Sequence, residues 1–132
     1  MKIRLTKILF LLFFTNIFGQ TNDRVYLYHG KSGDSLNRYV VDETTIHSDS
    51  TFTTKIYYIS RKEWEEYKKI KPEISKGKII RKNNYYVMAE YRNGIKTDYF
   101  WNLNILDDKL IFYFSNKRDK LKKSETYYRI EK

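Results

Sequence analysis

The stretch NGIKTDYFWNLNILDDKLIFYFSN, Asn93–Asn116, contains two turn signals and two runs of alternating apolar residues. Asn93-Gly94 predicts a two-residue hairpin, because a type I′ turn needs a positive φ at both central residues. Asp107-Asp108 marks a second, weaker turn. With the alternating run that begins at Tyr85, the stretch predicts three antiparallel strands in a row.

The two turns set the expected register. The first turn predicts the pairs Arg92–Ile95, Met88–Tyr99 and Tyr86–Trp101. The second turn, with Leu106 facing Lys109, predicts Ile105–Leu110, Leu103–Phe112 and Trp101–Phe114. Both turns place Trp101 on the same face of the sheet. A slip of one residue in the pairing would move all the apolar side chains of that face to the opposite face. The face predicted to be the core comprises Tyr86, Met88, Tyr99, Trp101, Leu103, Ile105, Leu110, Phe112 and Phe114.

The opposite face of these strands mixes aromatic and polar side chains. Aromatic rings beside amide groups suit sugars and small amphipathic ligands. The alternative is that tyrosine simply fits a half-exposed strand. The residues predicted to bind a ligand on this face are Tyr91, Phe100, Asn102 and Tyr113.

A short helix is expected before these strands. The segment SRKEWEEYKKIKPE follows an alternating strand at Thr51–Ile59. Ser60 with Glu63 forms a capping-box pattern, and Pro72 disfavours helical geometry in the residue before it. The pattern predicts an α-helix over about residues 61–71, whose inner side chains are Trp64, Tyr67 and the stem of Lys71.

Shorter strands complete the expected order of three strands, one helix and five strands. They lie at Val25–Tyr28, Arg38–Val41, Lys78–Arg81 and Glu125–Ile130, and the segments HGKSGDSLN and DETTIHSDST read as loops. We therefore expect a mainly β fold, an antiparallel meander forming a small barrel or strongly curved sheet with the short α-helix packed on it. An α+β fold is the alternative. Residues 20–132 are expected to form one domain.

The N-terminus resembles a secretory signal peptide. Lys2, Arg4 and Lys7 precede the apolar run Ile8–Phe14, and Gly19 offers a small residue for cleavage. Residues 1–19 are therefore the predicted signal, and cleavage falls before or after Gln20. The chain has no cysteine. We expect an exported bacterial protein of the periplasm or exterior, without stable membrane insertion of the mature chain.

Loss of residues 1–19 leaves 23 basic and 16 acidic residues, a net charge of +7. A basic surface invites a polyanion such as nucleic acid. Lys, Ile, Tyr and Asn, all encoded by A+T-rich codons, make up 54 of the 132 residues, so codon bias is the competing explanation. The candidate polyanion-binding residues are Lys68, Lys69, Lys76, Lys78, Arg81 and Lys82.

His29 and His47, each in or beside an expected loop, are the candidate acid-base residues. Common nucleophile motifs and phosphate-binding Gly-rich loops are lacking. The oxygen-rich segment around His47 and Asp49 matches no metal-site spacing, and neither a metal nor a cofactor is expected.

The leading hypothesis is a secreted or periplasmic non-catalytic binding or interaction protein. Its ligand is a small amphipathic molecule, a glycan or a protein. One alternative is a small secreted, ribonuclease-like hydrolase that uses His29 or His47. Another is a polyanion-binding protein. An accessory subunit of an envelope assembly is the remaining alternative, and it would show an exposed apolar patch or an unpaired edge strand.

Overall fold

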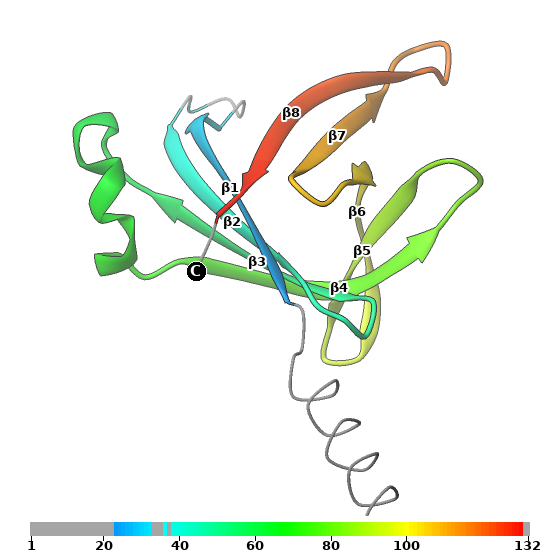
Figure 1. The fold of residues 1–132 in the computed structure, drawn as a ribbon, viewed down its shortest axis with the longest axis horizontal. Helices are drawn as coiled ribbons and strands as arrows, with labels where there is room; N and C mark the ends of the chain where they lie inside the picture. Colours follow the sequence, from blue (N-terminus) through cyan, green and yellow to red (C-terminus); the bar gives the residue numbers. More distant parts are fainter. Residues whose placement is uncertain (1–22, 33–35, 37, 131–132) are drawn as a thin grey trace, which may run out of the picture.

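The computed structural model describes residues 23–32, 36 and 38–130. Eight antiparallel strands, each paired with the next along the chain, form a closed barrel in sequence order (Figure 1). The strands are β1 Arg24–Lys31, β2 Tyr39–Ile46, β3 Thr51–Tyr58, β4 Glu73–Arg81, β5 Tyr86–Arg92, β6 Ile95–Ile105, β7 Lys109–Ser115 and β8 Leu121–Arg129. A short helix, η1 (Arg61–Lys69), lies between β3 and β4. The predicted mainly β barrel with one short helix is confirmed.

The hairpin between β5 and β6 forms at the predicted turn. Asn93 and Gly94 both have positive φ, 52° and 78°, and Arg92 pairs with Ile95. Two pairs across the second turn, Ile105–Leu110 and Leu103–Phe112, are also confirmed. The strand direction and turn positions of β5–β7 therefore follow from local turn chemistry.

The predicted pairs of Met88 with Tyr99 and Tyr86 with Trp101 are wrong. A bulge between Ala89 and Tyr91 shifts the ladder by two residues, so Met88 pairs with Trp101 and Tyr86 with Leu103. A shift of two preserves the side of the sheet, because side chains alternate with a period of two. The core face is therefore predicted correctly for most of its members.

Two members of the predicted core face are not in the core. Tyr99 is 62% exposed, since it lies within the bulge of β6. Phe114 is 50% exposed, because the pairing of β6 with β7 ends at Asn102–Tyr113 and leaves Phe114 beyond it.

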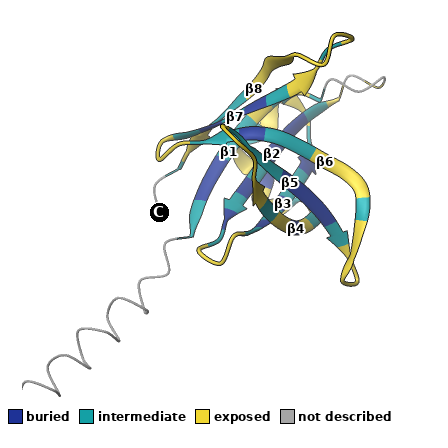
Figure 2. Ribbon diagram, turned by 90° about the vertical axis from the view of Figure 1, so that its right-hand side faces the viewer, coloured by how far each residue is buried: buried dark blue, intermediate teal, exposed yellow. Residues whose placement is uncertain are grey.

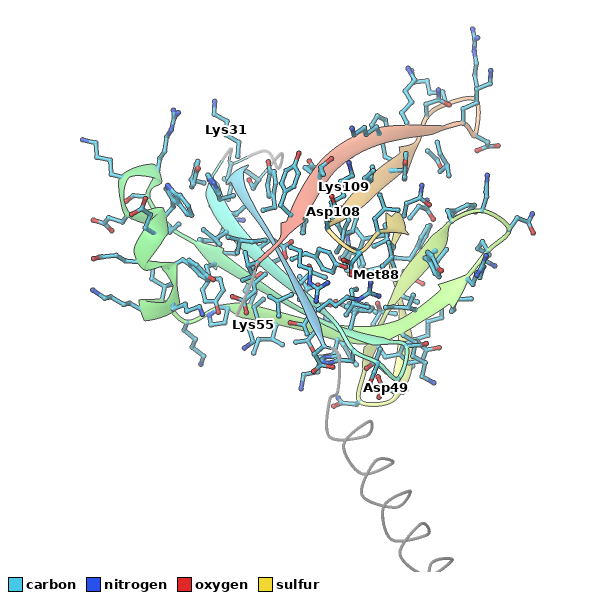
Figure 3. All side chains as sticks on the ribbon, viewed as in Figure 1. Lys31, Asp49, Lys55, Met88, Asp108 and Lys109 are labelled. Atoms are coloured by element: carbon cyan, nitrogen blue, oxygen red, sulfur yellow. The ribbon has the colours of Figure 1, made fainter. Side chains whose placement is uncertain are left out.

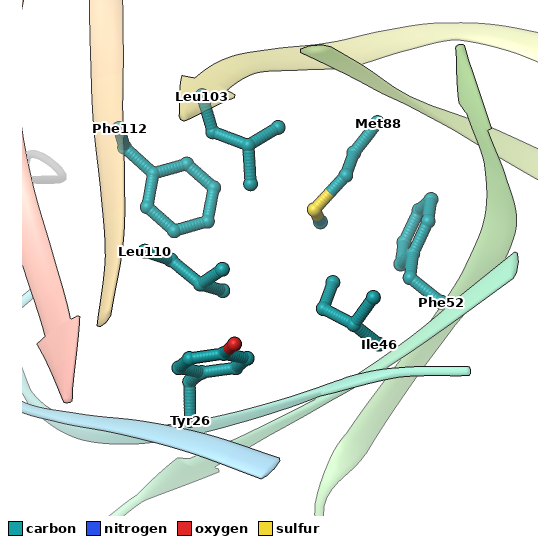
Figure 4. Close-up of a cluster of buried hydrophobic side chains, with 7 residues drawn as sticks. All are labelled: Tyr26, Ile46, Phe52, Met88, Leu103, Leu110 and Phe112. Carbon is teal, nitrogen blue, oxygen red and sulfur yellow. The ribbon is translucent and has the colours of Figure 1, made fainter. Parts of the chain in front are cut away.

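The main core fills the barrel interior. Seven buried side chains converge there from six strands (Figure 4): Tyr26, Ile46, Phe52, Met88, Leu103, Leu110 and Phe112. Buried segments recur on most strands, whereas the turns at the ends of the strands are exposed (Figure 2). In an eight-stranded barrel the interior is just wide enough for side chains or one small ligand.

The helix packs on the outer surface of β1–β3. Trp64 and Tyr67 face the barrel, as predicted, and Tyr67 joins Val41 and Tyr57 in a second buried cluster. Residues three apart eclipse one another in a 3₁₀ helix, so this geometry aligns Trp64 with Tyr67.

The predicted α-helix over residues 61–71 is otherwise corrected. The segment is a 3₁₀ helix that ends at Lys69, with non-helical geometry at Glu66. The side chain of Ser60 makes no capping bond, and Lys71 is exposed. Without the side-chain cap, the first turn is closed by the Glu63 N–H, which donates to the Ser60 carbonyl at 3.1 Å.

Two segments expected to be loops are partly strand. Residues 29–31 complete β1, and residues 42–46 complete β2. The second segment contains carboxylate and hydroxyl side chains, which predict a solvated loop, but Asp42 and Thr44 are buried inside the barrel.

The barrel closes between β1 and β8 along a short seam. Only two residue pairs join these strands, Tyr26–Arg129 and Leu27–Tyr128. Beside them, the Ile130 N–H donates to the Val25 carbonyl at 2.9 Å. Beyond this seam β8 runs away from β1 (Figure 1).

The predicted signal peptide, residues 1–19, lies outside the described residues. Within the described part of the chain, η1 is too short and too polar to cross a bilayer.

We predict that Gly77→Ala destabilises the barrel by about 2 kcal/mol, a typical cost of forcing an extra group into packed surroundings. A Cβ at Gly77 would collide with the backbone carbonyl of Ala89 and lie 2.8 Å from the Phe52 ring. Urea unfolding followed by tryptophan fluorescence measures the change. Gly30→Ala is the matched control, because its nearest obstacle is the movable hydroxyl of Tyr28 at 2.6 Å. Equal costs for the two variants would contradict the tight β4–β5 approach.

Candidate functional site

The predicted binding residues lie on the outer surface of β5–β7. Phe100 and Asn102 alternate along β6 with the interior residues Trp101 and Leu103, so they face outward. Asn102 pairs with Tyr113 of β7. Phe100 is 59% exposed. Three of the four predicted residues therefore occupy one continuous patch, which we call the β6 outer face: Phe100, Asn102, Asn104 and Tyr113.

Hydrogen bonding orders part of this face. The Asn104 side-chain amide donates to the Tyr113 hydroxyl at 3.2 Å. The tyrosine oxygen is the acceptor, so its own proton can be donated to a bound molecule. An aromatic ring, two amides and a phenol are thus presented side by side.

Tyr91, the fourth predicted residue, lies at the edge of this face. It pairs with Lys96, as the turn register predicts, whereas Phe100 pairs with Ala89 on the other side of the bulge. The Lys78 ammonium lies 4.7 Å from the centre of the Tyr91 ring, a cation–π contact. One face of the ring is therefore occupied by Lys78.

The two histidines do not converge. His29 pairs with Val41 near the end of β1, whereas His47 follows Ile46, which pairs with Arg24 at the start of β1. They lie at opposite ends of the same hairpin. Five residues of extended strand, Arg24 to His29, cover roughly 17 Å at about 3.3 Å per residue.

Each histidine has its own partners. The His29 ring stacks on Trp64 with centroids 3.8 Å apart, and its Nδ1 lies 2.7 Å from the Tyr39 hydroxyl. These contacts attach η1 to β1 and β2.

His47 is held at both ring nitrogens. Its Nδ1 lies 3.0 Å from Asp23 Oδ2, and its Nε2 lies 2.9 Å from the Thr53 hydroxyl. Asp23, His47 and Thr53 thus follow the order carboxylate, imidazole, hydroxyl, which is also that of a catalytic triad. A triad also needs N–H donors near the hydroxyl to stabilise an oxyanion. However, Thr53 lies in a strand that is paired on both sides, with Thr45 of β2 and Lys76 of β4. The backbone N–H groups around it are used in strand pairing and are not available to an oxyanion. The arrangement fastens the start of β1 to the β2–β3 turn.

The candidate polyanion residues divide among three places. Lys68 and Lys69 lie on η1, where Lys69 is 3.5 Å from Glu66. Lys76 and Lys78 face outward from β4. The third place is the β4–β5 turn, where a solvent-open hollow is lined by Arg81, Lys82, Asn83 and Tyr85.

A chain of buried polar side chains inside the barrel was missed from the sequence. The Tyr127 hydroxyl donates to Asp42 Oδ2 at 2.7 Å, and the Thr44 hydroxyl donates to Asp42 Oδ1 at 3.1 Å. Thr44 and Thr54 oxygens are 3.2 Å apart. The chain thus links β8, β2 and β3 across the seam.

A second group continues around the wall. Thr54 pairs with Ser75 of β4, whose hydroxyl donates to Glu90 at 2.7 Å. Thr97 donates to the other Glu90 oxygen at 3.0 Å, and Arg92 lies 3.1 Å from it. The bulge in β6 brings Thr97 to Glu90. In the described part of the chain, every buried side-chain nitrogen and oxygen has a partner.

The pKa values of the two buried carboxylates are shifted in opposite directions. Burial raises the pKa of Asp42 to about 6, although hydrogen bonds from Tyr127 and Thr44 oppose the shift. Hydrogen bonding from Ser75 is the main cause that lowers the pKa of Glu90. Among the described residues, neither carboxylate belongs to a group of three metal-binding side chains.

Alternation could have revealed this chain. In YVVDETTI, Asp42 and Thr44 share a side with Ile46, which is the pattern of an interior strand face if the polar residues have partners. Those partners are distant in sequence, since Tyr127 is 85 residues from Asp42. The segment was instead predicted to be a loop, because its carboxylate and hydroxyl side chains are typical of solvated loops.

Asp42 gives a testable pH dependence. The folded pKa, about 6, exceeds the usual value of 3.8. The folded state therefore binds more protons between these values, and its stability falls as pH rises through 6. From pH 5 to pH 7 we expect the free energy of unfolding to fall by about 1 kcal/mol more in the natural chain than in Asp42→Asn.

Denaturant unfolding at several pH values measures this difference. Asp49→Asn is the control, because Asp49 is exposed and its pKa is lowered, chiefly by the hydrogen bond from the Thr51 side chain. Its effect therefore lies at more acidic pH. Parallel pH profiles for the natural chain and Asp42→Asn would contradict the ionisation of a buried Asp42.

Comparisons of the chain with protein-family models, with curated proteins and with solved structures found no match.

Proposed function

We propose that this chain is an exported, non-catalytic binding protein whose β6 outer face binds a glycan. Export rests on the basic-then-apolar order of residues 1–19. The binding role rests on the side chains that β6 presents to solvent.

The observation that carries the proposal is the exposure of Phe100 on the same face as the hydrogen-bonded Asn104 amide. A phenylalanine 59% exposed within a strand loses the free energy that its burial would contribute. On the same face the Asn104 amide is already bonded to the Tyr113 hydroxyl. An apolar ring beside orientated polar groups complements a sugar, which has an apolar face and a rim of hydroxyls.

The position of the face supports binding without catalysis. Neither histidine lies on it, since His29 is on β1 and His47 follows β2. The strands that carry it are paired on both sides, β5 with β4 and β6, and β7 with β6 and β8. Side chains on such a framework keep their spacing when a ligand binds.

The experiment is retention of the mature chain, residues 20–132, on insoluble polysaccharides. Peptidoglycan, chitin, cellulose and starch are the probes. We expect retention on at least one of them, and Phe100→Ala should weaken it about tenfold, the loss expected when one stacked ring is removed. Pull-down isotherms measure the apparent dissociation constants.

Tyr128→Ala is the matched control, because Tyr128 is an aromatic residue of β8 with a similar exposure of 63%. Retention that falls equally in both variants would reflect general stickiness and contradict the proposal. Lack of retention on every polysaccharide would also contradict it. Heparin retention that vanishes in salt, with no polysaccharide retained, would favour the polyanion alternative.

A further inference from the structure

The barrel wall is open between β1 and β8 beyond their short seam. β1 pairs with β2 through Lys31, but its last residue paired with β8 is Leu27. β8 pairs with β7 from Leu121 onward, but only Tyr128 and Arg129 pair with β1. Tyr28 and Tyr127, the next residues on each strand, stack on each other with ring centroids 5.2 Å apart. Beyond them, two strand segments, residues 29–31 and 121–126, border one opening, each without a strand partner on that side in the described part of the chain.

Main-chain groups of β1 face this opening. The Val25 carbonyl accepts a bond from the Ile130 N–H on that side of β1. Main-chain groups alternate in direction along an antiparallel strand, so His29 and Lys31 turn the same way as Val25. On the other side of β1, the Ser32 N–H donates to Arg38 at 2.7 Å, as this alternation requires. The N–H groups of His29 and Lys31 are therefore free of the β1–β2 ladder.

The border of the opening is strongly basic. The two segments and the β7–β8 turn carry six basic and two acidic residues: Lys31, Lys117, Arg118, Lys120, Lys122 and Lys123, with Asp119 and Glu125. Lys31 extends outward from the end of β1 (Figure 3). Lysines and a bulge on an edge strand also prevent pairing with other copies. β8 has both, because its pairing with β7 shifts between Ile111 and Tyr113.

We propose that this opening binds an extended acidic peptide segment of another polypeptide by strand addition. The lysines repel a second basic copy of this chain and attract an acidic strand, while the His29 and Lys31 N–H groups, which lie outside the β1–β2 ladder, supply hydrogen bonds. The Lys31 carbonyl already accepts a bond from the Tyr28 hydroxyl at 3.4 Å. β1 and β8 are antiparallel, so an added strand that runs antiparallel to β1 is parallel to β8. This site is separate from the β6 outer face and does not depend on the glycan proposal.

Two labelled peptides of equal charge provide the test. One alternates valine and glutamate over eight residues, and the other alternates proline and glutamate. Proline has no N–H and cannot complete a strand ladder, so the second peptide reports charge attraction alone. Fluorescence anisotropy with the mature chain, at physiological salt, should show the valine peptide binding at least about tenfold more tightly. A valine–lysine peptide should not bind.

Two substitutions at one position isolate the main-chain contribution. Lys31→Ala removes the charge and keeps the N–H, whereas Lys31→Pro removes both. Since the Lys31 N–H is not used by the β1–β2 ladder, proline is tolerated there, and circular dichroism checks the fold. We expect Lys31→Pro to bind the valine peptide about fivefold more weakly than Lys31→Ala, the effect of one hydrogen bond.

Equal binding of the valine and proline peptides would overturn strand addition and leave only charge attraction. Equal affinities of the two Lys31 variants would exclude β1 as the paired edge and overturn the proposal as stated. Lack of binding by the valine peptide up to millimolar concentration would overturn it as well.

Discussion

The hydrogen bond from the Tyr127 hydroxyl to Asp42, 2.7 Å long, is the contact on which the closed barrel depends. The main-chain seam between β1 and β8 comprises two residue pairs, and the chain has no cysteine to replace them. Tyr127 reaches past β1 to β2 and also stacks on Tyr28, with ring centroids 5.2 Å apart. One side chain thus joins the last strand to the first two. Without it, the ends of the meander would be joined mainly by the two residue pairs of the β1–β8 seam.

This contact involves a buried carboxylate, and the polar chain around it offsets the cost of burial. A buried polar group left without a partner costs roughly 1–3 kcal/mol. Asp42 accepts two hydrogen bonds, and Thr44 and Thr54 extend the chain to β3. Slipping β2 against β3 by two residues would separate these hydroxyls. The apolar cluster supplies most of the stabilisation, while the polar chain discriminates between registers that would bury similar apolar area.

Local chemistry in the sequence was enough to predict the strand order, the Asn93-Gly94 turn and most of the core face. It failed where a distant partner decides the structure. The bulge opposite Glu90 shifts β6 by two residues and brings the Thr97 hydroxyl to the Glu90 carboxylate, and nothing in the turn indicates this. The same reason explains why Asp42 was assigned to a loop. Of the candidate site, the outward direction of Phe100 followed from alternation, whereas its pairing with Ala89 across the bulge did not.

The seam also accounts for the asymmetry of the barrel. At one end, Arg129 contacts Asp107 at 2.7 Å and the Tyr26 hydroxyl donates to the Leu106 carbonyl at 2.7 Å, so several contacts hold the strands together. At the other end β8 carries Lys122 and Lys123, and like charges on an edge oppose both closure and self-association. Extending the β1–β8 pairing beyond Leu27–Tyr128 would bring these lysines towards Lys31 of β1. The positive charge that opposes self-association therefore also opposes closure of the wall beyond the seam, and an acidic strand is the partner that would relieve the repulsion while completing the ladder.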